Sequence, residues 1–129
     1  MTCVQEIRHF LHCDRVVVYQ FQADGSGLIV AESVENAFLS SLGHHTAQPC
    51  LPSQQTLSYS REQPTAAANI YQAGYPACHV EMLEQYQVKA NLAVPIQVNG
   101  QLWGLLISHQ CTDYRDWQEA EISFFSFVS

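Results

Sequence analysis

The chain has 129 residues, of which 47% are hydrophobic and 13% are charged, and this length suits a single domain. Its formal charge of −7 disfavours a nucleic acid or an anionic membrane as the partner, because both attract basic proteins. No apolar run is long enough to cross a bilayer and no signal peptide is recognisable. We therefore expect one soluble, cytoplasmic domain over residues 1–129, without membrane contact.

Cysteine usage argues against a disulfide scaffold and against a zinc site. The five cysteines are odd in number, irregularly spaced at positions 3, 13, 50, 78 and 111, and form no CxxC pair. His9, His12 and Cys13 could crowd one helix end, but no fourth ligand accompanies them, so no metal is expected. At least one cysteine is a candidate reactive thiol, and the others are expected to be small buried hydrophobic residues.

The first half of the chain predicts a helix, a hairpin and a second short helix. Apolar side chains recur at helical spacing over residues 3–12. Runs of β-branched and aromatic residues predict strands over 15–22 and 27–33, separated by the turn ADGSG. A short helical piece over 36–42 is expected to end at Gly43 as a left-handed cap.

The second half begins with a long loop. Residues 44–65 contain three prolines and no sustained periodicity, and a loop of this length in a compact domain is typically functional. The elements expected after it are a short strand over 66–71, a helix over 78–88, a hairpin over 89–98 and 101–111 that turns at Asn99-Gly100, and a helix from Trp117.

The strand over 101–111 is apolar on both alternating faces, with Leu102 and Leu106 on one and Trp103, Leu105 and Ile107 on the other. A strand of this kind is central and covered on both sides. The element order predicts an α+β fold with a central antiparallel sheet of five to six strands sandwiched between helices. The last helix is too apolar to be solvated, and packing on the sheet, on a homodimer partner or on further chain would each satisfy it.

Cys78 and His79 follow the turn AGYPA and open the helix over 78–88. Backbone N–H groups and the helix dipole favour a thiolate at this position. By helical spacing, Cys78 shares a face with Met82, and His79 lies in line with Tyr86. The pair is either a thiol that captures an electrophile beside a packing histidine, or a buried cysteine beside an incidental histidine, and the spacing leaves both interpretations open.

The stretch IYQAGYPACHVEMLEQYQVKANLAVPI at 70–96, followed by LWGLLISHQC at 102–111, closely resembles cyanobacteriochrome GAF domains, the bilin-binding photoreceptor relatives of phytochromes. The resemblance extends to VVVYQF, ESVENAFLSSLG and RDWQEAEI and so covers nearly the whole chain. It implies a GAF fold and a light-sensing rather than enzymatic function. It also implies excision from a larger sensor protein with an output domain such as a histidine kinase or a chemoreceptor.

The resemblance further implies a covalent phycocyanobilin or phycoviolobilin that isomerises at the ring D side. Cys78 would form a thioether to ring A, and His79 would pack against the inner pyrroles. His109 would approach ring D. By strand alternation His109 projects with Trp103, on an apolar face where an unpaired polar ring is costly, so its partner would be a bilin carbonyl or the backbone.

A bilin also carries two propionates, which call for Arg or Lys. Arg61 in the long loop is the first candidate and Lys89 the second, although Arg61 could equally be solvated. Phe38 stands where the family often has tryptophan, and Asn69 stands where an acid commonly precedes the Ile-Tyr pair that ends at Tyr71. The predicted chromophore site comprises Cys78, His79, Cys50, His109, Gln48, Leu51, Tyr86, Met82, Arg61, Phe38, Asn69, Tyr71 and Trp103.

Cys50 lies in the segment Gln48-Pro49-Cys50-Leu51, where the two-cysteine subfamily reads Asp-x-Cys-Phe. In that subfamily the second thiol adds reversibly to the central methine bridge. Here Gln48 replaces the acid and Leu51 the aromatic residue, so a protonated bilin should be less stabilised, and the thiol adduct or a deprotonated bilin favoured. The alternative is that Cys50 is a spare loop thiol.

Two other functions compete with this prediction. A GAF domain could bind a cyclic nucleotide or another small metabolite without a covalent bond, although few cations are available for a phosphate. A thiol enzyme could pair Cys78 with His79, but adjacent residues on a helix diverge by about 100°, which places His79 poorly as a base for its own neighbour.

Overall fold

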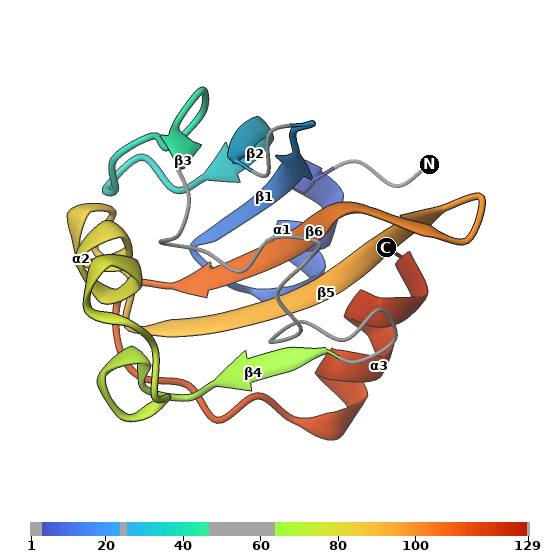
Figure 1. The fold of residues 1–129 in the computed structure, drawn as a ribbon. Coiled ribbons are helices and arrows are strands. Elements are labelled where there is room, and N and C mark those ends of the chain that lie inside the picture. Colours follow the sequence, from blue (N-terminus) through green and yellow to red (C-terminus); the bar gives the residue numbers. More distant parts are fainter. Residues whose placement is uncertain (1–3, 24–25, 47–63, 129) are drawn as a thin grey trace.

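The computed structural model describes residues 4–23, 26–46 and 64–128. Six antiparallel strands form one sheet in the order β3-β2-β1-β6-β5-β4, with helices on both of its faces (Figure 1). The elements are α1 (Val4–Leu11), β1 (Arg15–Phe21), β2 (Gly27–Val34), β3 (His45–Thr46), β4 (Thr65–Ala67), the 3-10 turn η1 (Ile70–Gln72), α2 (Ala77–Gln85), β5 (Ala90–Val98), β6 (Gln101–Gln110) and α3 (Glu119–Val128). The predicted fold class is confirmed.

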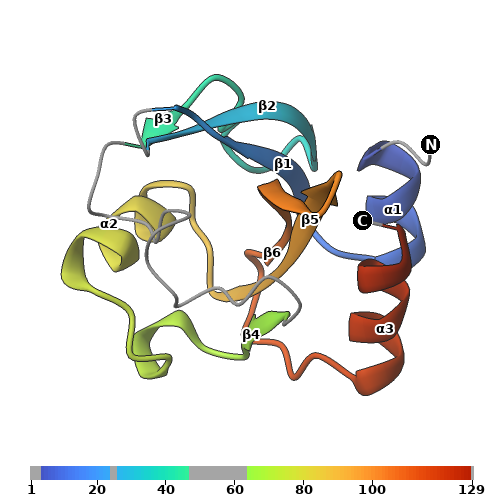
Figure 2. The same cartoon turned by 45° about the vertical axis from the view of Figure 1, so that its right-hand side comes forward.

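Two helices from opposite ends of the chain cover one face of the sheet. Figure 2 shows α1 and α3 side by side on this face and α2 on the opposite side. Phe10 of α1 stacks on Phe124 of α3 with ring centroids 4.2 Å apart. Phe125 is fully buried in the cluster that joins both helices to the sheet. The apolar last helix therefore packs on the sheet, one of the three possibilities considered.

The hairpin β5–β6 forms as its sequence predicts. Asn99 and Gly100 have φ values of 53° and 77°, the left-handed geometry of a tight hairpin turn that Asn-Gly favours. β6 lies between β1 and β5, so its predicted central position is confirmed. The pairing register of β5 and β6 shifts between Ile96 and Gln97. At this step β6 has one residue more than β5.

That irregularity corrects the predicted faces of β6. Leu102 packs in the same cluster as Leu105 and Ile107, on the face opposite Leu106, although strict alternation had placed it with Leu106. Trp103 is only half-buried and belongs to neither sheet-face cluster. The extra residue of a β-bulge moves the side chains beyond it to the opposite face of the sheet. The residue pattern alone did not reveal this bulge.

The predicted helix over 36–42 is wrong, because this segment folds as turns. Several of its polar groups bond to neighbouring elements, which holds the segment in this form. Ser41 donates its backbone N–H and its hydroxyl to Glu32 Oε2, at 2.7 and 2.6 Å. The N–H of Leu39 donates to Gln87 Oε1 at 3.1 Å. Gly43 has the expected positive φ of 85°, but it closes a turn and caps no helix.

The strand predicted over 66–71 is shorter than expected. β4 ends at Ala67, and a 3-10 turn begins at Ile70, where the Asn69 side chain accepts a hydrogen bond from the Tyr71 N–H at 2.9 Å. An asparagine that caps the next turn in this way competes with strand pairing. In the part of the chain that the structure describes, no helix is both long and apolar enough to cross a membrane.

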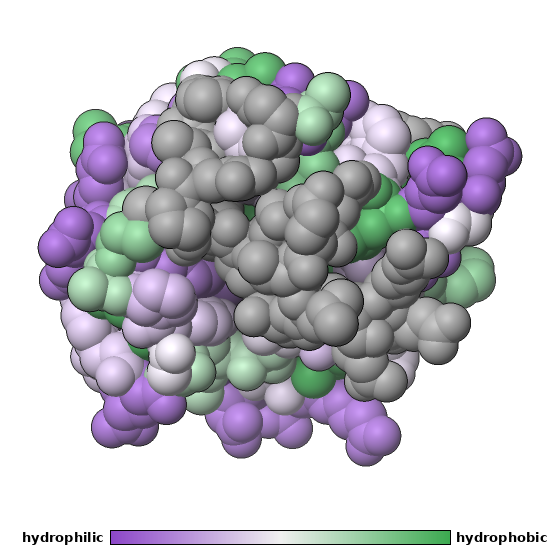
Figure 3. Space-filling view, viewed as in Figure 1, coloured by the Kyte–Doolittle hydropathy of each residue, from purple (hydrophilic) through white to green (hydrophobic). Residues whose placement is uncertain are grey.

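Hydrophilic side chains lie around the rim of the face viewed in Figure 3, over the outer side of α2 and over the β5–β6 hairpin. The apolar residues of the sheet lie beneath them, in two clusters on opposite faces. The face away from α1 and α3 carries the residues that the sequence associates with a ligand.

Candidate functional site

The site begins at the N-terminus of α2. Gly74 has a φ of 78° and turns the chain, and Pro76 precedes the helix with a φ of −58°, the value that a proline ring imposes. Cys78 is therefore the second residue of α2 and is half-buried. Its sulfur is in a disulfide bond in this structure, so capture of an electrophile at this position requires the reduced thiol.

His79 points inward from the same helical turn. Its side chain is 3% exposed and lies against the ring of Tyr75, with centroids 4.3 Å apart. Burial lowers the pKa of His79 to about 4, because a charged imidazole loses its hydration there. His79 is thus a neutral, flat group near neutral pH, and the incidental exposed histidine of the alternative interpretation is excluded.

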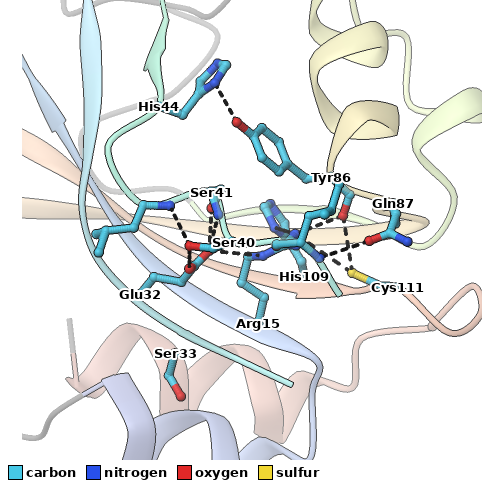
Figure 4. A network of polar contacts seen from close by, with 12 residues as sticks. Arg15, Glu32, Ser33, Ser40, Ser41, His44, Tyr86, Gln87, His109 and Cys111 are labelled. Atoms are coloured by element: carbon cyan, nitrogen blue, oxygen red, sulfur yellow. Dashed lines mark hydrogen bonds and ion pairs between the residues drawn. The ribbon is translucent and has the colours of Figure 1, made fainter. Parts of the chain in front are cut away.

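His109 lies on β6, on the face that carries Leu105 and Ile107, as predicted. It is buried, and its Nδ1 is 3.1 Å from Nη1 of Arg15. Burial, the Arg15 guanidinium and the nearby imidazole of His79 together hold the pKa of His109 well below its ordinary value. The protein partner of this ring is therefore an arginine, where the sequence analysis had considered only the backbone (Figure 4).

An apolar cluster forms the floor of the candidate site. Its members come from β1, β2, β5 and β6, and Met82 of α2 packs against it; contact of Met82 with a ligand stays a prediction. The cluster consists of Val17, Tyr19, Phe21, Ile29, Ala93, Leu102, Leu105 and Ile107. Gly27 allows this packing, because a Cβ at that position would lie 1.8 Å from Cζ of Tyr19.

Asn91 is a candidate site residue that the sequence pattern did not single out. It is 2% exposed and is the register partner of His109 on β5. Its Nδ2 donates to the Tyr75 hydroxyl at 3.2 Å, whereas its buried Oδ1 has no hydrogen-bond partner. A buried amide oxygen without a partner is unusual in a folded protein, and it is an acceptor suited to a ligand N–H. The sequence shows only a polar residue within an apolar strand.

The other two cysteines that the structure describes are unsuited to reaction. Cys13 and Cys111 are free but buried. Burial raises the pKa of both thiols, that of Cys111 to about 11. A buried thiol with a raised pKa carries little thiolate, the nucleophilic form. Cys78 is thus the best-placed nucleophile among the described cysteines.

The cations in the described ranges offer little to an anionic ligand. Arg8 pairs with Glu35 at 2.6 Å, and Arg115 pairs with Glu121. Lys89, the second propionate candidate, is exposed, and its Nζ lies 6.0 Å from the centre of the Tyr114 ring. Within the described residues, no group of three or more His, Cys, Asp or Glu side chains could hold a metal ion.

The remaining predicted site residues lie in different surroundings. Tyr86 closes α2, and its hydroxyl lies 2.8 Å from Nδ1 of His44. Phe38 packs on the cluster that contains Leu83, beneath α2. By contrast, Tyr71 is 52% exposed and donates its hydroxyl to Glu84 at 2.8 Å, so its place in the chromophore site stays a prediction.

Asn69 serves as the cap of η1, so its side-chain oxygen already has a partner. Four further predicted residues lie outside the described residues: Gln48, Cys50, Leu51 and Arg61.

Comparison with known proteins identifies the fold family. The GAF domain model matches residues 1–129. A putative methyl-accepting chemotaxis protein of Synechocystis sp. is 43% identical over 94% of this chain, which spans 12% of that protein. The blue-light absorbing form of the Thermosynechococcus elongatus PixJ GAF-domain superposes with a TM-score of 0.89 and 38% identity, over 97% of this chain and 74% of that one.

A third match was solved with a ligand. The far-red absorbing dark state of JSC1_58120g3 with bound biliverdin IXa has a TM-score of 0.85 and 29% identity, over 97% of this chain and 80% of that chain. Both of these matched proteins absorb light, one blue and the other far-red. The chain belongs to the GAF domain family and matches cyanobacteriochrome members of it.

Proposed function

We propose that this GAF domain is a light-sensing module that holds a linear tetrapyrrole, phycocyanobilin or phycoviolobilin, through a thioether from Cys78. One arrangement carries the proposal: a half-buried cysteine opens α2 directly beside a buried, neutral His79. The biliverdin-bound match supports a ligand of this class. The reduced Cys78 thiol would add across a side-chain double bond of ring A, which needs no oxidant and expels no leaving group.

The residues of the site fit such a group. The apolar cluster over Tyr19 and Leu105 offers a dry wall to a flat conjugated molecule. His79 offers the face of a neutral ring, and the unpartnered Oδ1 of Asn91 can accept from a pyrrole or lactam N–H. His109 can donate to a carbonyl oxygen. When bound, the bilin would supply visible absorption and isomerise at the ring D side.

The proposal also includes a second, reversible thioether from Cys50 to the bilin. The resemblance to the two-cysteine subfamily supports it, as does the match to a blue-light absorbing PixJ domain. With Gln48 in place of the acid, the site offers no carboxylate at that position to a cationic bilin. We expect the Cys50→Ala variant to lose any violet or blue band. A spectrum of the unmodified domain dominated by a red band across neutral pH would contradict this part. Arg61 remains the first candidate for a propionate.

Attachment at Cys78 is tested by expressing the chain together with a bilin-producing pathway under reducing conditions. The purified protein is denatured and examined on a gel for zinc-enhanced bilin fluorescence. We expect a fluorescent band that disappears in Cys78→Ala and persists in the matched control Cys111→Ala. Absence of the band from the unmodified chain, or its persistence in Cys78→Ala, would overturn the proposal and leave a non-covalent metabolite as the alternative.

We also propose that the chain is one module, residues 1–129, of a longer sensor protein. The Synechocystis relative, of which it spans 12%, is named as a chemotaxis protein, which supports a chemoreceptor output domain. A histidine kinase is the other output domain that we propose.

Two exposed aromatic side chains support a homodimer through the terminal helices: Phe10 on α1 and Phe127 on α3 are 66% and 88% exposed. Analytical ultracentrifugation should then show a dimer that Phe127→Ser weakens, and a monomer at all concentrations would contradict it.

A further inference from the structure

Arg15 is a fully buried cation at the first position of β1. Its Nη2 donates to the backbone oxygen of Leu39 at 2.6 Å, and its Nη1 to that of Tyr86 at 3.1 Å. Its Nε lies 3.3 Å from Glu32 Oε2, in an ion pair whose two side chains are 0% and 4% exposed. These contacts come from β2, from the turn segment that contains Leu39 and from the end of α2, and they fix the position of the guanidinium; Figure 4 labels Arg15, Glu32 and Tyr86.

The same guanidinium determines which nitrogen of His109 carries the proton. Arg15 and His109 are register partners on β1 and β6, and Nη1 lies 3.1 Å from Nδ1 of the imidazole. A guanidinium has N–H donors only and does not lose its proton in proteins, so Nδ1 must be the acceptor. A neutral imidazole that accepts at Nδ1 carries its proton on Nε2.

The second nitrogen is thereby left as a donor toward the site. Among the described residues, none forms a hydrogen bond with His109 Nε2, and the bond to the ring is the one at Nδ1. The ring lies on the face of the sheet that carries the apolar cluster with Leu105 and Ile107. Protonation of His109 is unfavourable for two reasons: the ring is buried, and the positive guanidinium of Arg15 already lies against Nδ1.

We infer that Arg15 is a positioning residue of the chromophore site, which holds His109 as the neutral Nε2–H tautomer so that it donates to a carbonyl oxygen of the ligand. The inference rests on the proposed function for the identity of the ligand. An Nε2–H donor matches the bilin carbonyl that the resemblance already implies for His109 and does not match a pyrrole N–H; the new element is that Arg15 holds the ring in this form. The same tautomer excludes His109 as a base that takes a proton from the ligand.

The tautomer can be observed directly in the unmodified domain. Two-bond ¹H–¹⁵N correlation spectra of ¹⁵N-histidine-labelled protein distinguish a protonated ring nitrogen from an unprotonated one. We expect His109 to show protonated Nε2 and unprotonated Nδ1 with or without bilin. Detection of the Nδ1–H tautomer, or of the doubly protonated ring, near neutral pH would overturn the inference.

Variants then test whether Arg15 causes this preference. Arg15→Met is combined with Glu32→Gln, so that no unpaired charge stays buried. We expect this double variant to lose the single tautomer and show a mixture. Arg8→Met serves as the matched control, because it removes another arginine–glutamate pair without touching His109. A single Nε2–H tautomer retained in the folded double variant would show that Arg15 does not set it.

The bilin-loaded protein provides a readout that a merely structural role would not change. Loss of the hydrogen bond from His109 should raise the infrared stretching frequency of a ligand carbonyl in the double variant. In a His109→Gln background, the glutamine amide nitrogen can donate to the ligand carbonyl without any choice of tautomer. There the Arg15→Met and Glu32→Gln changes should leave the carbonyl stretching frequency unchanged. An equal shift in both backgrounds would refute positioning through His109. Failure of bilin attachment is seen separately on the zinc gel and would count against the proposed function, whereas the tautomer measurement needs no bilin.

Discussion

The buried imidazole of His79 should make the bilin-free domain lose stability as the solution becomes acidic. Its pKa is about 4 in the folded state, against an ordinary value of 6.5. Between these values the unfolded chain binds a proton that the folded protein does not, so the stability from neutral His79 is present above about pH 6.5 and is lost as the pH falls. Linkage gives a loss of about 2 kcal/mol between about pH 7 and about pH 5.

The variant His79→Phe isolates this contribution, because phenylalanine keeps a ring against Tyr75 but cannot titrate. Urea unfolding at both pH values gives the free energy of unfolding for each protein. We expect the decrease on acidification to be about 2 kcal/mol smaller in the variant. His109 also has a lowered pKa, whose largest cause is burial; this cause is present in both proteins, so most of the His109 contribution is common to them. Equal decreases in the two proteins would show that His79 is not held neutral by the fold.

Three further predictions concern the scaffold of the site, each measured by urea unfolding. Phe125→Ala should destabilise the domain by about 3–5 kcal/mol, because this side chain is fully buried, whereas Phe127→Ala should change stability by less than about 0.5 kcal/mol; similar effects would refute the observed packing of α3. Gly27→Ala should cost about 1–3 kcal/mol, because its Cβ would meet the Tyr19 ring at 1.8 Å, and it should cost far less in a Tyr19→Ala background. Asp14→Ala should cost about 1–3 kcal/mol, since Oδ2 accepts the backbone N–H groups after β6 at 2.7 and 2.9 Å; an unchanged transition would argue against that role.

Local sequence signals predicted elements whose cause is itself local. The Asn99-Gly100 turn requires positive φ at both positions, and these two residue types adopt it most readily. The start of α2 follows from Gly74 and Pro76 for a similar reason. The segment 36–42 was mispredicted because the groups that bind its backbone belong to Glu32 and Gln87, and no local pattern reveals such long-range partners.

The residues of the site likewise divide into those with a local sequence signal and those placed only by long-range contacts. Cys78 and His79 are adjacent in sequence and share one helical turn, so their resemblance to a known motif was enough to select them. Tyr71 belongs to the same motif, but it lies within η1, is 52% exposed and donates its hydroxyl to Glu84. Arg15 and Asn91 carry no signal of their own, because a charged residue at a strand start is usually solvated and a single asparagine in a strand is unremarkable.

By itself, the sequence determined the fold class, the central place of β6 and the cysteine at the start of α2, because each rests on periodicity, turn chemistry or a motif within one short segment. Only the tertiary structure decided which polar groups meet. Strand register places Arg15, His109 and Asn91 side by side, although they are far apart along the chain. Hydrogen bonds to Arg15 of β1 and to Tyr75, which precedes α2, then determine which atoms are already engaged, namely Nδ1 of His109 and Nδ2 of Asn91, and which atoms remain to contact a ligand.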